Sequence, residues 1–270
     1  TELLDFGGDE IYFQQVPTKL LGKPFSDAVV AYEKNTVLGM LKPGQQPKLN
    51  PSMDTILAGD DQLILIAADD DKIALSEQVL ISDNLISSGK TTPVDVEHTL
   101  LLGWNWKAPS IIRELEAYVT EGSGIHVVAD IEGLEEQIST VEKTIQKQKI
   151  SWELADATDR KVLDQLDYHC YNHIVLLCYS DTLDAQEADA RTLITLLHLR
   201  DISEKQNMHY SVVSEMIDIR NRNLAEVTRA DDFIVSDKLV SLMLAQVSEN
   251  KKLNAVFEDL FDPEGSEIYL

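Results

Sequence analysis

The sequence is poor in cysteine, in positive charge and in long apolar runs, and each shortage excludes a class of protein. Its 270 residues include only two cysteines, Cys170 and Cys178. Two cysteines make no disulfide framework, which indicates a reducing compartment. No apolar run approaches the roughly 18 residues of a membrane-spanning helix, and Thr1 begins no signal peptide. We therefore expect the chain, as it stands, to be soluble.

Positive charge is the clearest shortage. Lysine and arginine number 23 against 47 aspartates and glutamates, which gives a formal net charge of -24. This excess repels nucleic acid phosphates and anionic membrane surfaces, so we expect no nucleic acid partner. Divalent cation binding, a high-salt habitat and simple solubility all fit the charge, and composition does not choose among them. The length predicts a sizeable core and two domains.

A glycine-led turn organises the chain. The apolar run Leu100–Leu102 enters a turn at Gly103 and leaves as a helix. The dinucleotide-binding pattern G-x-G-x-x-G appears here as Gly103, Asn105 and Ala108, so two of its three glycines are replaced. We expect Asn105 to tolerate a left-handed backbone in place of the second glycine. Ala108 is small enough to let the helix pack closely on the strand.

An acidic residue follows at the expected spacing. Asp130 lies 22 positions after Ala108 and closes the apolar run 125–129, where a dinucleotide-binding fold places an acid for the ribose hydroxyls. Trp104 and Trp106 flank the place where the backbone must approach a pyrophosphate, and their bulk could close the site. The residues thus leave two alternatives open: a nucleotide site, or a Rossmann-like domain with an empty or altered pocket.

Apolar runs and amphipathic segments alternate after this turn. We expect helices at 111–119, 131–148 and 185–202, a short helix within 155–166, and strands at 125–129, 150–154, 174–178 and 210–214. Such alternation predicts an α/β fold with a doubly wound parallel sheet and right-handed crossovers. Ligands bind such sheets at the carboxyl edge.

The domain boundaries follow from composition. Residues 1–72 predict a small α/β lobe, with strands at 10–16, 36–41 and 62–68 and a helix at 25–33 that is capped by Ser26. Residues 73–97 form a linker, 98–230 the Rossmann-like domain, and 231–270 a crossover helix and the start of a next lobe. That helix begins at Ser236 and has a wide apolar surface, which we expect to dock on a second copy or on its own domain.

Two clusters contain residue types that bind metal ions. Five aspartates stand at the two ends of the strand at 62–68: Asp60, Asp61, Asp69, Asp70 and Asp71. Calcium binding by these carboxylates is one hypothesis, and the simpler interpretation is that they are solvated turn residues. His169, Cys170 and His173 share a helical spacing, but they directly precede a strand, so we predict no metal site there.

The two ends of the chain resemble each other. Residues 259–270 (DLFDPEGSEIYL) repeat much of residues 2–13 (ELLDFGGDEIYF). The period is longer than that of solenoid repeats, which indicates a duplicated domain module. We therefore expect the chain to be a piece of a larger protein.

A family resemblance covers nearly the whole chain. The small lobe, the Rossmann-like unit, the stretch 155–159 (ADATD) and the crossover helix resemble the RCK or TrkA-type domains that regulate potassium conductance in Trk-type transport regulators and channel gating rings. The stretch 101–109 (LLGWNWKAP) resembles the CASTOR and POLLUX-related ion channels and their bacterial relatives. The first lobe then corresponds to an RCK-C (TrkA-C) lobe and residues 98–230 to an RCK-N (TrkA-N) domain.

The resemblance implies a function. It implies a cytoplasmic regulatory domain below a transmembrane pore, assembled as a homo-oligomer with dimers in a ring, and responsive to NAD, an adenine nucleotide or calcium. By position it assigns four residues to the phosphate turn: Gly103, Trp104, Asn105 and Ala108. It assigns Asp130 to the ribose, and Asp156, Ala157 and Thr158 to the adenine. Cys178 and Ser180 would close the edge of the site. The chain departs from the family's usual Gly-Asp-Ala-Thr at Ala155 and from its glycine-rich turn.

The rival function is an NAD(P)-dependent oxidoreductase, because the same fold serves hydride transfer. Such an enzyme needs a proton donor near the nicotinamide. The sequence contains no Tyr-x-x-x-Lys pair and no other evident acid/base constellation. We therefore predict a gating module rather than an enzyme, with movement between lobes as its mechanism. A ligand-free ring scaffold is the third hypothesis.

Overall fold

A computed structural model describes residues 8–76, 95–208, 210–221, 232–263 and 265. The chain divides into two compact units, one formed by residues 1–90 with 239–270 and the other by residues 91–238. Within the described ranges, no helix is both long enough and apolar enough to cross a membrane. Most of the expected linker, and half of the repeat shared by the two ends, lie outside the described residues.

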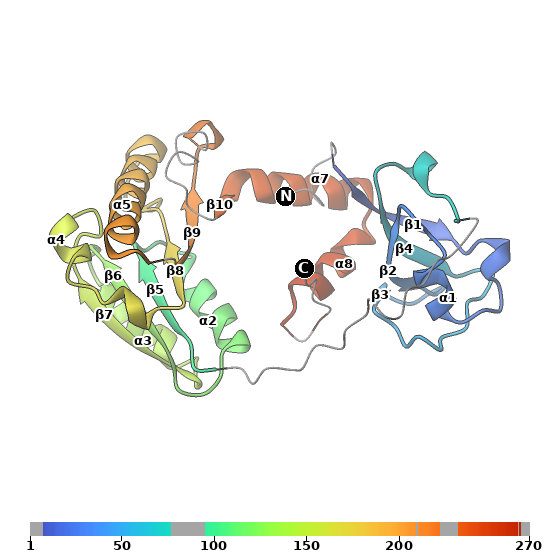
Figure 1. The fold of residues 1–270 in the computed structure, drawn as a ribbon, viewed down its shortest axis with the longest axis horizontal. Helices are drawn as coiled ribbons and strands as arrows, with labels where there is room; N and C mark the ends of the chain where they lie inside the picture. Colours follow the sequence, from blue (N-terminus) through green and yellow to red (C-terminus); the bar gives the residue numbers. More distant parts are fainter. Residues whose placement is uncertain (1–7, 77–94, 209, 222–231, 264, 266–270) are drawn as a thin grey trace. The chain divides into compact units, whose positions relative to one another are not determined.

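The first unit is built on an antiparallel four-stranded sheet with the order β1-β4-β2-β3 (Figure 1). The strands are β1 (Glu10–Gln15), β2 (Thr36–Leu41), β3 (Lys48–Leu49) and β4 (Gln62–Ala67). A short helix, α1 (Phe25–Val29), follows Pro24. Ser26 lies inside this helix and does not cap it, because the helix already begins at Phe25. Two 3-10 turns complete the lobe, at Thr18–Leu20 and Asp70–Lys72.

Side chains of β4 alternate between two cores. Leu63 and Leu65 pack with Phe25 of α1 on one face of the sheet. Ile64 packs on the other face with the two last helices, α7 (Ser236–Glu249) and α8 (Leu253–Phe261). One apolar face of these helices is therefore covered by the sheet of the same chain, while Val240 and Leu244 of α7 stay exposed.

The second unit is a six-stranded, fully parallel sheet with the order β10-β9-β8-β5-β6-β7. The strand order reverses between β5 and β8, which places a topological switch point there. The strands are β5 (His98–Leu102), β6 (Ser123–Ala129), β7 (Gln148–Leu154), β8 (His173–Leu176), β9 (Ser211–Met216) and β10 (Asp232–Val235). This topology confirms the predicted doubly wound α/β fold.

Helices pack against this sheet through two cores. Leu101 and Val127 pack with α2 (Ala108–Tyr118) and α3 (Leu134–Glu142), whereas Leu100 and Ile174 pack on the side that holds α4 (Arg160–Leu163) and α5 (Ala185–Gln206). Two 3-10 turns lie at Tyr168–Cys170 and Ile219–Asn221. Helix α3 is shorter than predicted because Gly133 caps it in a left-handed conformation and Gln148 already begins β7. Strand β10 was not predicted.

Candidate functional site at the carboxyl edge of the parallel sheet

The turn between β5 and α2 lies at the switch point, where a parallel sheet binds its ligands. Gly103 has a φ of 82°, and a Cβ built on it lies 2.2 Å from the backbone oxygen of Leu177. Only glycine fits this position, for both reasons. Ala108 begins α2 fully buried, as a small residue must where a helix packs on a strand.

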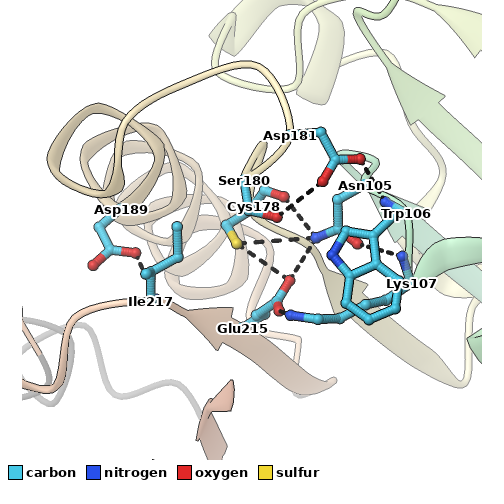
Figure 2. A network of polar contacts seen from close by, with 9 residues as sticks. All are labelled: Asn105, Trp106, Lys107, Cys178, Ser180, Asp181, Asp189, Glu215 and Ile217. Carbon is cyan, nitrogen blue, oxygen red and sulfur yellow. Dashed lines mark hydrogen bonds and ion pairs between the residues drawn. The ribbon is translucent and has the colours of Figure 1, made fainter. Parts of the chain in front are cut away.

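The backbone of Asn105 corrects one expectation. Among the described residues, the non-glycine residues with positive φ are Asn50 and Asn207, so Asn105 does not adopt the left-handed conformation. Its side chain is instead buried and turned inward (Figure 2). The amide nitrogen donates to the Cys178 oxygen at 2.8 Å and to Glu215 Oε2 at 2.7 Å, while Oδ1 accepts the Lys107 N–H at 3.0 Å.

The sequence analysis missed Asp181 and Arg191 at this edge, and it also missed Glu215. Glu215 lies on β9 and is buried, with its carboxylate paired to Lys107 Nζ at 2.5 Å and accepting from Cys178 Sγ at 3.2 Å. Burial, and then the Glu215 charge, raise the pKa of the Cys178 thiol to about 12, so the sulfur stays protonated. The signal was present, because Glu215 is the one charged residue in the strand SVVSEM.

The two tryptophans of the turn lie in different environments. Trp104 is buried in the core beside α2 and α3, and its Nε1 donates to Gln137 Oε1 at 2.8 Å. Trp106 is 68% exposed, and its backbone N–H donates to Asp181 Oδ2 at 2.7 Å. The Trp104 indole therefore stabilises the core, and the N–H of Trp106 already has a carboxylate partner.

The predicted ribose residue, Asp130, stands exposed directly after β6. Its backbone N–H donates to the hydroxyl of Tyr179 at 3.3 Å. The Tyr179 side chain is buried, and the Arg191 guanidinium lies 4.9 Å from its ring centroid. Burial raises the pKa of the Tyr179 hydroxyl above its ordinary value.

The residues predicted beside an adenine lie after β7. Asp156 accepts hydrogen bonds from the backbone and hydroxyl of Thr158, and it pairs with Arg191 at 2.9 Å. Partial burial opposes ionisation, but these hydrogen bonds and the Arg191 charge outweigh it and lower the pKa of Asp156. Ala157 is buried in the core on the α5 side. Ser180 lies 3.4 Å from Asp181 through its hydroxyl.

The structure thus joins some of the predicted site residues in two polar groups. Asn105 and Cys178 meet through Glu215 at the switch point. Asp130 and Asp156 meet the same edge through Tyr179 and Arg191. Trp104 and Ala157 instead belong to the two cores.

The described residues contain no group of three or more His, Cys, Asp or Glu side chains arranged to hold a metal ion. The acidic residues around β4 serve their own turns. Asp61 accepts the Ala58 N–H at 2.9 Å, and Asp69 accepts the Asp70 N–H at 2.7 Å.

Comparison with known proteins agrees with this architecture. Residues 1–83 match the family model described as Castor and Pollux, part of voltage-gated ion channel. The chain is 26% identical to the probable ion channel POLLUX of Oryza sativa subsp. japonica, over 99% of this chain and 31% of that protein. It is 25% identical to the ion channel CASTOR of Lotus japonicus, over 100% of this chain and 36% of that protein.

The chain therefore spans about a third of the length of these curated relatives. Its fold is similar to that of the human SLO3 gating ring, with a TM-score of 0.64 over 94% of this chain and 52% of that one, at 12% identity. Along its whole length, the chain is similar in sequence to the CASTOR and POLLUX ion channels.

Proposed function

We propose that this chain is the regulatory, gating-ring module of an ion channel or potassium transport system. In this function a nucleotide or a cation binds the module and favours one arrangement of its two units. Movement between the arrangements controls ion flux through a transmembrane pore in the parent protein. The module lies on the cytoplasmic face of the membrane and assembles as a homo-oligomer, with dimers in a ring.

The similarity to ion channels is the observation that carries this proposal. It runs along 99–100% of the chain but covers 31–36% of the relatives in rice and Lotus, so it matches one part of a channel. The fold similarity to a gating ring supports the regulatory part rather than any other. A ligand controls such a module only through a difference in its affinity for the two arrangements.

The geometry of the carboxyl edge argues against the oxidoreductase alternative. A dehydrogenase needs an acid or base that exchanges a proton with the substrate. Around the described switch point, Lys107 and Glu215 pair with each other, and the Cys178 thiol has a raised pKa. These groups are engaged with one another in a network that is largely buried.

Thermal unfolding of the chain with NAD, NADH, ATP, ADP and calcium, each alone, tests the sensing part of this function. A ligand that binds the folded state stabilises it by about 2.7 kcal/mol at a concentration 100 times its Kd. We expect an upward shift with one of these ligands. For a nucleotide, Asp130→Ala should reduce the shift, whereas Glu114→Ala on the exposed face of α2 should leave it unchanged.

Other outcomes select the other hypotheses. An unchanged unfolding temperature with all five ligands would contradict sensing and favour a ligand-free ring scaffold. Turnover of a nicotinamide cofactor with a small alcohol or carbonyl would favour the oxidoreductase.

A further inference from the structure

The phosphate position of the β5–α2 turn already holds a carboxylate. In Rossmann folds the pyrophosphate accepts hydrogen bonds from backbone N–H groups where the first helix begins. Here the Trp106 N–H donates to the Asp181 carboxylate at 2.7 Å, and the Lys107 N–H donates to Asn105 Oδ1 at 3.0 Å (Figure 2). Asp181 thus supplies the anion that a phosphate oxygen would otherwise supply.

Tyr179, two positions before Asp181, fills the adenosine side of the same edge. The Tyr179 ring lies 3.5 Å from the position of a Cβ built on Gly103, and its hydroxyl accepts the Asp130 N–H at 3.3 Å. The side chain is 4% exposed, so it is packed and not loosely placed over the edge. It therefore spans the distance between the phosphate turn and the ribose residue, which is the path that an adenosine diphosphate group follows in this fold.

The charges at the turn also oppose the binding of a pyrophosphate. The Asp181 and Glu215 carboxylates both stand at the turn, and the nearby cations Lys107 and Arg191 are paired with Glu215 and Asp156. A pyrophosphate that approached the turn would meet the exposed Asp181 carboxylate, which already accepts the Trp106 N–H. It binds well only once Asp181 has left.

We propose that the segment 179–181 is an internal ligand that closes the nucleotide edge, and that a nucleotide binds by displacing it. This inference rests on the proposed nucleotide sensing and adds its regulation. Tyr179 and Asp181 belong to one short segment, so one movement frees both the adenosine and the phosphate positions. The apparent Kd for a nucleotide equals the intrinsic Kd divided by the fraction of molecules in which the segment has moved away.

The test is calorimetric titration of the whole chain with ADP. This probe contains the adenosine diphosphate group of NAD without its nicotinamide part. Asp181→Ala removes the internal carboxylate, and we expect it to lower the apparent Kd for ADP at least about tenfold. Asp181→Asn keeps an oxygen for the Trp106 N–H but removes the charge. The Kd of this variant for ADP should therefore lie between the values for the native chain and for Asp181→Ala. Glu187→Ala removes a charge from the exposed first turn of α5 and should leave the Kd within about twofold of the native value.

A second measurement needs no variant. In the native chain, ADP should shift the NMR signal of the Trp106 backbone amide, because that amide exchanges Asp181 for a phosphate oxygen. ADP binding with an unchanged Trp106 signal overturns the proposal. This measurement also decides the matter if Asp181→Ala does not fold.

The outcomes separate this inference from the proposed function. If native chain and Asp181→Ala bind ADP equally well, displacement is wrong while nucleotide sensing stands. If neither binds ADP, displacement is wrong, and the unfolding shifts with NAD, NADH, ATP and calcium then decide whether the module senses another nucleotide or a cation.

Discussion

Gly103 stands where neither the backbone angle nor the available space permits a side chain. Gly103→Ala combines a positive φ with a Cβ at 2.2 Å from the Leu177 oxygen, and we expect it to lower the free energy of unfolding by about 3 kcal/mol. Gly133→Ala is the matched control, since its φ of 76° is similar but no atom lies within 4 Å. It should cost about 1 kcal/mol. Denaturant unfolding measures both, and equal losses would contradict the steric argument.

Substitutions of Lys107 and Glu215 should have non-additive effects on the free energy of unfolding. Lys107→Met removes the Lys107 cation from the buried Glu215 carboxylate, and we expect the free energy of unfolding to fall by about 2 kcal/mol, less than for a fully buried pair because the lysine side chain is 29% exposed. Glu215→Gln in the same chain should recover part of this loss, because no unpaired charge remains buried. A double-mutant cycle measured by denaturant unfolding tests this, and additive losses would show that the pair is not coupled.

Asp156 predicts a dependence of stability on pH. Its hydrogen bonds and Arg191 outweigh the opposing effect of burial and place its folded-state pKa below the ordinary 3.8. A lowered folded-state pKa contributes stability that is present above that ordinary value and is lost as the pH falls through the folded-state pKa. We expect Asp156→Asn to be less stable than the native chain near pH 6, with the difference shrinking towards pH 3.

Asp54→Asn provides the control for this pH experiment, because Asp54 is exposed in the other unit. Its stability should follow that of the native chain at both pH values. If the difference in stability between Asp156→Asn and the native chain stays constant with pH, the ionisation of Asp156 does not cause it.

At the scale of elements, helix α8 seals one face of the four-stranded sheet. Phe257 is buried against Ile64 of β4 and its neighbours, so Phe257→Ala should cost about 3–5 kcal/mol through lost burial and the cavity left behind. Phe261 lies one turn later and is 58% exposed, and Phe261→Ala should cost less than about 1 kcal/mol. Thermal unfolding of the two variants compares them directly, and similar losses would mean that α8 does not dock through this face.

At the scale of the whole molecule, the first unit is assembled from both ends of the chain. Residues 239–270 complete the unit that begins with residues 1–90. A chain that stops at Lys238 leaves the β4 face around Ile11, Leu49 and Ile64 without its helices. We expect such a chain to keep the parallel-sheet unit folded, and to lose hydrogen-exchange protection in β1, β2 and β4.

Hydrogen exchange followed by mass spectrometry measures this in a single sample. The strands β5, β6 and β8 of the other unit serve as the internal control, because they keep all of their neighbours. Unchanged protection of β4 in the shortened chain would contradict the need for α7 and α8.

The sequence by itself determined the alternation of strands and helices, the place of the Gly103 turn and the class of the fold. These are local properties, because a strand, a turn and a helix each follow from the pattern of a few neighbouring residues. The predicted strand at 36–41 has the observed bounds of β2, and the predicted α5 begins at Ala185 as observed. The ends of α1 and α3 were less predictable because caps and strand pairing decide them.

Only the tertiary structure decided what fills the carboxyl edge. Glu215 reaches Asn105 across 110 positions, and Asp181 reaches the Trp106 N–H across 75. No local pattern states which distant loops meet at a sheet edge, because that follows from the strand order and from the packing of the helices on the sheet. Asn105 tolerates a left-handed backbone but does not adopt one here, and the buried partners of its side chain come from β9 and from the segment that follows β8.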